Sequence, residues 1–221
     1  MLKMLKLDWS AIKCYHIILR LLLIVACFLV TGWFSTIWLV PEGVFWAFCF
    51  SINPFAVEEA WNLDRLYLTL PINRSRVVAC RYLLSLILFL AGTILALALM
   101  PLTNLYSFSR WYPDLKWSLA LVSFGFLIHA LLSLFMYPIL FRLGYRKGHI
   151  WGFYLPVLLT GVVYLTIIEY DLMAGGTFLF NCLVYASEHT LSVIGGMLGL
   201  GAVILAGSWL LSTKLYSRRD F

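Results

Sequence analysis

Charged side chains are scarce in this sequence: 12% of its 221 residues are Asp, Glu, Lys or Arg, whereas 63% are hydrophobic. A soluble domain carries about 25% charged residues, which cover its surface. The scarcity excludes an ordinary soluble domain. It predicts an all-α polytopic membrane protein whose residues 1–221 form a single transmembrane domain.

Paired cysteines and nucleotide-binding motifs are also missing. The five cysteines show no regular spacing, so neither a disulfide framework nor a cysteine metal site is predicted. No GxxxxGK[ST] motif occurs, and no GxGxxG motif follows a strand. The chain is therefore expected not to be an enzyme, to hold no metal or cofactor of its own, and to bind no nucleic acid.

Long stretches without charge are what the sequence has instead. A helix needs roughly 20 apolar residues to cross a bilayer, and five stretches meet this need, whereas residues 43–57 form a shorter one. Because cytoplasmic flanks collect Lys and Arg, the basic clusters within residues 3–20 and 65–81 share one side only if the short stretch crosses. The sequence thus predicts six spans with both termini in the cytoplasm, near residues 17–40, 43–58, 80–100, 117–141, 150–169 and 189–212.

One further segment is expected to lie at the membrane surface or to enter it without crossing. Residues 172–187, before the last span, either dip into the outer leaflet and return or form an amphipathic surface helix. Both alternatives for this segment stay open.

One charged stretch, NPFAVEEAWNLDRLYLTLPINRSRVVACRY, interrupts the apolar sequence at residues 53–82. Ionisable groups at a membrane are costly and mark functional sites. Positive-inside anchoring accounts for arginines such as Arg81 and Arg142, but it does not call for the adjacent acids Glu58 and Glu59. Residues 58–78 are therefore predicted to be a functional loop.

Paired glutamates near a span end also resemble one element of CAAX-type intramembrane proteases. That family has an EExxxR run and histidines on neighbouring spans, whereas this sequence reads EEAWNLDR, which places Arg65 too far from Glu59. The family's Phe-x-x-x-His element is missing as well, because Gly125 stands four residues before His129. A protease is therefore the alternative rather than the main hypothesis.

Two features inside predicted spans have competing interpretations. His129 in the fourth span either lines a translocation path or makes a hydrogen-bonded contact between helices. Gly195 and Gly199 in the sixth span form a small-xxx-small step, which favours close packing of helices.

At three places the sequence resembles the permease subunits of type-2 ABC exporters, specifically their small six-span bacterial branch. The run TLPINRSRVVACRYL after the second span is similar to a run of those permeases, LKMLKLDWSAIKCY resembles their amphipathic connecting helix, and STKLYSRRDF resembles their tail. The layout of the whole chain is similar too.

The resemblance implies that residues 1–15 form an amphipathic interfacial helix. It also implies a permease that pairs with a second copy, as a homodimer, in the lipid of a bacterial cell membrane. A separate cytoplasmic ABC ATPase would bind ATP and Mg²⁺ and drive export, and an amphipathic, antimicrobial or toxin peptide is the expected cargo. An immunity or scaffold protein without transport and a secondary transporter are further alternatives. By position, the residues expected at the ATPase-coupling surface are Glu58, Glu59, Asp64, Arg65, Arg74 and Arg76.

Overall fold

The computed structural model describes residues 17–34, 38–61, 74–106, 115–173, 185 and 188–218. These described residues form helices and turns, with no strand among them. The helices are α2 (Ile17–Phe34), α3 (Leu39–Ser51), α4 (Asn53–Ala60), α6 (Arg74–Asn104), α7 (Leu115–Leu143), α8 (Tyr145–His149), the π-helical turn η2 (Ile150–Tyr154), α9 (Leu155–Met173) and α11 (Thr190–Ser217).

Four helical stretches among the described residues are long and apolar enough to cross a membrane: Leu39–Ala60, Arg74–Asn104, Leu115–Leu143 and Thr190–Ser217. Leu22–Trp33 is a shorter apolar helix. These helices confirm an all-helical membrane protein, while the count of six spans stays a prediction. The predicted interfacial helix at residues 1–15 and most of the segment at 172–187 lie outside the described residues.

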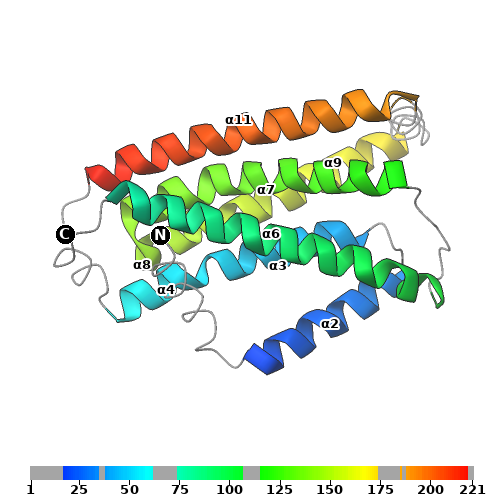
Figure 1. Ribbon diagram of the computed structural model, residues 1–221, viewed down its shortest axis with the longest axis horizontal. Coiled ribbons are helices and arrows are strands. Elements are labelled where there is room, and N and C mark those ends of the chain that lie inside the picture. The colour runs from blue at the N-terminus through cyan, green and yellow to red at the C-terminus, as the bar shows by residue number, and fades with distance from the viewer. Residues whose placement is uncertain are drawn as a thin grey trace.

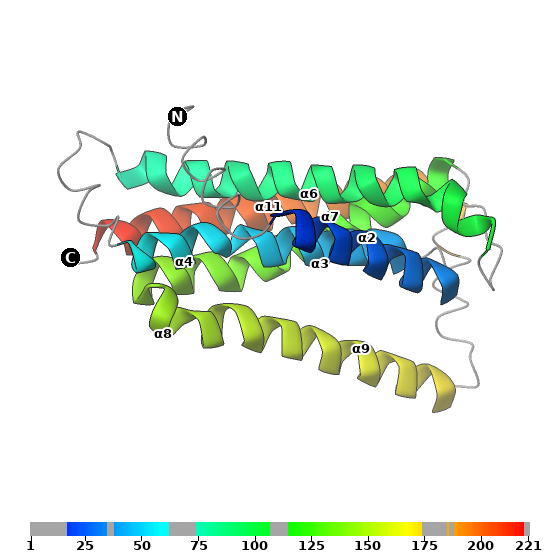
Figure 2. The same cartoon turned by 90° about the horizontal axis from the view of Figure 1, so that it is seen from below.

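The helices run roughly side by side in an elongated bundle, with α7 at its centre (Figures 1 and 2). α11 packs along α7 over most of its length and also touches α6, whereas α3 packs between α6 and α7. α2 packs against α6 and α3. α9 contacts α7 and η2, and Figure 2 shows it running along one side of the bundle.

Two glycines set the closest approach between α3 and α6. A Cβ atom on Gly43 would lie 2.7 Å from the carbonyl oxygen of Gly92, and one on Gly92 would lie 2.6 Å from the carbonyl oxygen of Gly43. Any side chain at either position would therefore push the helices apart. This contact was not predicted, whereas a Cβ atom on either of the predicted packing residues, Gly195 and Gly199, would meet no atom of another described element within 4 Å. Within the described part of the chain, the small-xxx-small step of α11 packs against no other helix.

The helix bounds differ from the predicted spans at the beginning of the second helical stretch and at the beginning of α6. The second helical stretch begins at Leu39, earlier than predicted, with Pro41 in its first turn. A proline is tolerated there because its missing N–H would have no partner within the helix. α6 begins at Arg74 rather than near residue 80, because arginine and serine continue a helix beyond the apolar stretch.

Charge separates the two ends of the bundle. One end of the bundle carries three glutamates: Glu42 in the first turn of α3, Glu169 near the end of α9 and Glu188 just before α11. Lys116 lies at the same end. At the other end α4, α7 and α11 finish and α6 begins, on the left in Figure 1. We call this second end the basic end, because it carries Arg74, Arg76, Arg142, Arg146, Lys147, Lys214 and Arg218.

Candidate functional site

The last turns of α4 bring the two adjacent glutamates to the basic end. Glu58 is buried, with 7% of its surface exposed, and its Oε2 accepts a hydrogen bond of 3.1 Å from Nη2 of Arg81. Arg81 lies in the second turn of α6 and is 2% exposed. The pair therefore ties the end of α4 to α6 by a buried salt bridge.

The surroundings of Arg81 hold the guanidinium in place. Its central carbon lies 4.8 Å from the centre of the Phe55 ring, in a cation–π contact. Its backbone carbonyl oxygen accepts a long hydrogen bond of 3.5 Å from the hydroxyl of Tyr137 on α7. Removing one partner of such a buried pair typically costs about 3–5 kcal/mol, because the other charge is left without compensation. The sequence had indicated only an anchoring role for Arg81.

Glu59 links α4 to the turn after α7. Its Oε2 accepts a hydrogen bond of 2.7 Å from the backbone N–H of Arg146, in the first turn of α8. A carboxylate is favourable there because the first N–H groups of a helix have no partners within it. The turn depends on Gly144, which has a φ of 76° and whose N–H caps α7 by bonding to the carbonyl of Leu140 at 2.9 Å.

Arg74 links the beginning of α6 to the end of α11. Its Nη1 donates hydrogen bonds to the carbonyl oxygens of Ser217 at 2.9 Å and Tyr216 at 3.4 Å. These carbonyls belong to the last turn of α11, where a cation also complements the negative end of the helix dipole. Arg76, two residues after Arg74 in α6, is exposed.

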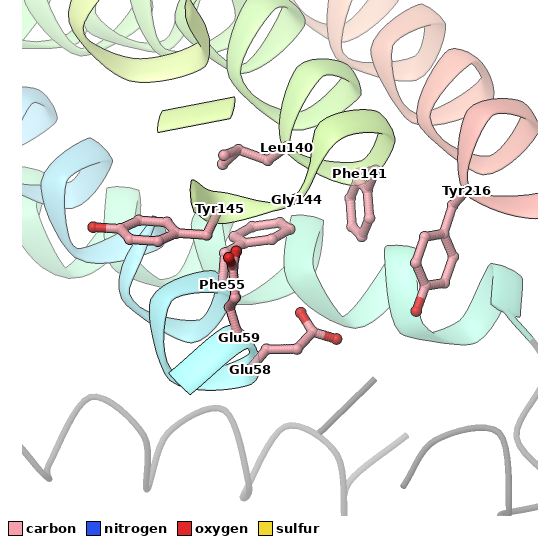
Figure 3. Close-up of a pocket in the computed structure, with 8 residues that line it drawn as sticks. All are labelled: Phe55, Glu58, Glu59, Leu140, Phe141, Gly144, Tyr145 and Tyr216. Carbon is pink, nitrogen blue, oxygen red and sulfur yellow. The ribbon is translucent and has the colours of Figure 1, made fainter. Parts of the chain in front are cut away.

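A small pocket lies among these links, shown in Figure 3. It is shallow, with room for about one water molecule. α4 provides both glutamates, whose side chains diverge in the figure, Glu59 toward Tyr145 and Glu58 toward Tyr216. The pocket thus combines two carboxylates with four aromatic rings. Its lining consists of Phe55, Glu58, Glu59, Leu140, Phe141, Gly144, Tyr145 and Tyr216.

A second polar region lies deeper in the bundle, between α6, α7 and α11. The hydroxyl of Tyr82 lies 2.6 Å from that of Ser208 and 2.8 Å from that of Ser212, and Ser208 also donates to the carbonyl of Ser133 at 3.1 Å. We call this region the neutral seam; it consists of Tyr82, Ser85, His129, Ser133, Ser208 and Ser212. All six of its residues are buried.

His129 belongs to this seam. Its Nε2 lies 2.8 Å from the Ser85 hydroxyl, so the side chain joins α7 to α6. The imidazole is 0% exposed and its ring centre lies 5.2 Å from that of Phe89. Of the two interpretations of His129, this geometry favours the hydrogen-bonded contact between helices.

The predicted coupling residues are thus distributed over several contacts. Glu58, Glu59 and Arg74 each bind a different neighbouring helix, whereas Asp64 and Arg65 lie outside the described residues. Within the described part of the chain, no three His, Cys, Asp or Glu side chains come together as a metal site. The two glutamates, which the protease alternative would use in catalysis, instead bind Arg81 and the first turn of α8.

The comparisons with known proteins add one match. Residues 3–217 match a family model described as ABC-2 family transporter protein. The match covers nearly the whole chain, including both the basic end and the neutral seam. No curated protein and no solved structure matches the chain.

Proposed function

This chain belongs to the ABC-2 family of transporter proteins, as its sequence resemblance predicted, and from that premise we propose that it is the permease subunit of an ATP-driven exporter. A separate cytoplasmic ABC ATPase binds ATP and Mg²⁺ and hydrolyses the nucleotide. Residues 58–78 and the contacts around them form the surface on which that ATPase acts.

The observation that carries the proposal is the convergence of three links at the basic end. Glu58 joins α4 to α6, Glu59 joins α4 to α8, and Arg74 joins α6 to α11. Each link is a hydrogen bond that involves a charged side chain, and such a bond is stronger than a neutral one. A force on the end of α4 is therefore transmitted to three other helices without any long flexible connection.

The orientation follows from the charge distribution. Lys and Arg gather on the cytoplasmic side of membrane proteins, so the basic end faces the cytoplasm, where an ATPase is available. In this orientation the chain crosses a bacterial cell membrane six times. The six spans are the four longer helical stretches together with α2 and α9.

Export also requires a pathway for the cargo through the membrane, and this pathway lies between two copies of the chain. Large apolar side chains are exposed on the outer faces of α2, α9 and α11, for example Leu22, Leu158 and Val203. Such faces are covered by lipid or by a second copy of the permease. Following the family resemblance, we take the complex to be a homodimer and the cargo to be an amphipathic peptide.

The proposal is tested with the variant Glu59→Lys in proteoliposomes that contain the permease and its ATPase. Reversing this charge repels the first turn of α8, while Glu58–Arg81 and the apolar core stay intact. We expect normal insertion and folding, continued ATP hydrolysis and loss of export. Unchanged export per ATP hydrolysed would remove the coupling role from this surface.

A further inference from the structure

The helices α7 and α11 present exposed apolar side chains on the side away from α6, and the row on each helix ends in an arginine. We propose that this face binds an anionic phospholipid of the cytoplasmic leaflet, with its acyl chains along the apolar side chains and its phosphate at Arg142 and Arg218. Such a site goes beyond the proposed function, because its ligand is a lipid rather than the ATPase. It takes from that function only the leaflet, through the orientation of the basic end.

The register of the two helices places their side chains level by level. α7 and α11 run side by side in the same direction (Figure 1). Ser208 donates to the carbonyl of Ser133, 75 positions earlier, and the ring of Tyr216 lies 5.2 Å from that of Phe141, at the same separation in the sequence. Each residue of α11 is therefore level with the α7 residue about 75 positions before it.

Each of the two helices carries one row of exposed side chains. Residues about 7, 11 or 18 positions apart lie on the same side of an α-helix. With this spacing, the rows are Phe124, Leu131, Phe135 and Arg142 on α7, and Leu200, Leu211 and Arg218 on α11. Because the register sets Arg142 level with Arg218, the two rows run parallel and end together at the basic end.

The two rows lie on the same side of the helix pair. Seen from the first residues of the helices, the row of α7 lies about a third of a turn clockwise from its contact with α11. The row of α11 lies about a quarter of a turn counterclockwise from its contact with α7. His129, which joins α7 to α6, lies counterclockwise from the α11 contact. The rows therefore share a surface that points away from α6, which we call the α7–α11 face.

Charge gives this face its polarity. Neither α7 nor α11 contains Asp or Glu, and exposed Lys214 lies one turn before Arg218. Within the described part of the chain, neither Arg142 nor Arg218 forms an ion pair. The last carbonyls of α11, which would repel an anion, already accept hydrogen bonds from Arg74. A phosphate at this end would thus meet several cations, with charge-assisted hydrogen bonds from guanidinium groups.

A second copy of the chain suits this face less well than a lipid does. In a membrane homodimer with a two-fold axis along the bilayer normal, equal residues of the two copies face each other. Packing one α7–α11 face on another would place Arg142 and Arg218 near their own equivalents, and like charges repel. An anionic phospholipid instead combines apolar chains with a negative headgroup, and basic residues beside the membrane attract such lipids.

The first test is native mass spectrometry of the intact permease, titrated in detergent with phosphatidylglycerol or with phosphatidylcholine of the same acyl chains. We expect tighter binding of phosphatidylglycerol. Arg142→Gln and Arg218→Gln should each weaken it about fivefold, the contribution of one cation near a membrane surface, and the double variant about 25-fold. Binding of zwitterionic phosphatidylcholine should change little.

The matched control is Arg76→Gln, which removes another exposed cation at the basic end but on α6, outside the α7–α11 face. It should bind phosphatidylglycerol like the wild type, and so should Arg142→Lys, which keeps the charge. Equal affinity of the wild type for the two lipids, or equal weakening by Arg76→Gln, would overturn the lipid site. Competition by free glycerol 3-phosphate as effective as that by the lipid would show a phosphate site instead.

The second test identifies what covers the face in a membrane. Phe135→p-benzoylphenylalanine places a photoreactive group on the α7–α11 face, and Leu83→p-benzoylphenylalanine places one on exposed α6, beside Tyr82 and at a similar depth. In nanodiscs with equal amounts of the two lipids, we expect an excess of phosphatidylglycerol adducts from the first variant and equal adducts from the second.

Two results of this cross-linking would contradict the lipid site. One is the same ratio of lipid adducts from both variants, and the other is a cross-link from Phe135→p-benzoylphenylalanine to a second copy of the permease. Both tests use the permease without its ATPase, so their failure would leave the proposed function untouched.

Discussion

The basic end and the neutral seam both hold polar groups between packed helices, but they do so with different kinds of contact. At the basic end each contact involves a charged side chain: Glu58 pairs with Arg81, Glu59 accepts from a backbone N–H of α8, and Arg74 donates to backbone carbonyls of α11. In the seam they are neutral hydrogen bonds between hydroxyls, a carbonyl and one imidazole.

The difference reflects the distance from water. A charged group inside a bilayer is expensive, so charges belong near its surface, where a partner or water compensates them. Hydroxyls satisfy one another at moderate cost and hold helices together at any depth. The comparison suggests that the seam fixes the arrangement of α6, α7 and α11, while the basic end is where an external protein can change it.

The largest effect is expected from Arg81→Met, which leaves the buried Glu58 carboxylate without its cation. The free energy of unfolding in detergent should fall by about 3–5 kcal/mol, which thermal unfolding would detect as a clear loss of stability. The double variant Glu58→Gln with Arg81→Met serves as the control. It should recover most of the loss, because no buried charge remains. If Arg81→Met alone is harmless, the buried salt bridge does not hold α4 to α6.

An intermediate effect is expected in the seam from Tyr82→Phe. This change removes the hydroxyl that lies between Ser208 and Ser212 but keeps the ring that packs against Tyr137, with centres 4.4 Å apart. The free energy of unfolding should fall by about 1–2 kcal/mol, the range for neutral hydrogen bonds between membrane helices. Ser212→Ala should cost less, because Tyr82 keeps Ser208. A loss as large as that of Arg81→Met would erase the distinction between the two regions.

The smallest effect is expected from Arg74→Ala. The last carbonyls of α11 would lose the hydrogen bonds from the Arg74 guanidinium, and the free energy of unfolding should fall by about 0.5–1 kcal/mol. Hydrogen exchange of amides in the last turn of α11 should become faster, while amides in the seam keep their rates. Arg76→Ala is the matched control, since its side chain is exposed, and should leave both regions unchanged. Equal acceleration in the two variants would show that the Arg74 contact does not hold α11.

The sequence predicted the class of the fold, the family and the place of the charged stretch. Long charge-free runs identify membrane helices directly, because hydrophobicity along the chain is a local property. The second helical stretch ends at Ala60, close to the predicted end of that span near residue 58. Family membership also followed from local runs such as TLPINRSRVVACRYL.

The pairings inside the bundle could not be predicted in the same way. Arg81 had the signature of a membrane anchor, and only the packing of α4 on α6 shows that it neutralises Glu58. Tyr82 and Ser212 are 130 residues apart, so no sequence spacing connects them. The contact of Gly43 with Gly92 is equally remote, and neither glycine has a distinctive local pattern. Such contacts depend on how the helices are rotated and placed, which one sequence does not reveal.

The most direct test of the central claim is gentle detergent purification of this chain from its native host, followed by mass spectrometry of the intact complex. The account predicts recovery with a P-loop ATPase in a one-to-one ratio. A homo-oligomer without any ATPase, in several detergents, would contradict the claim that this chain is driven through its basic end.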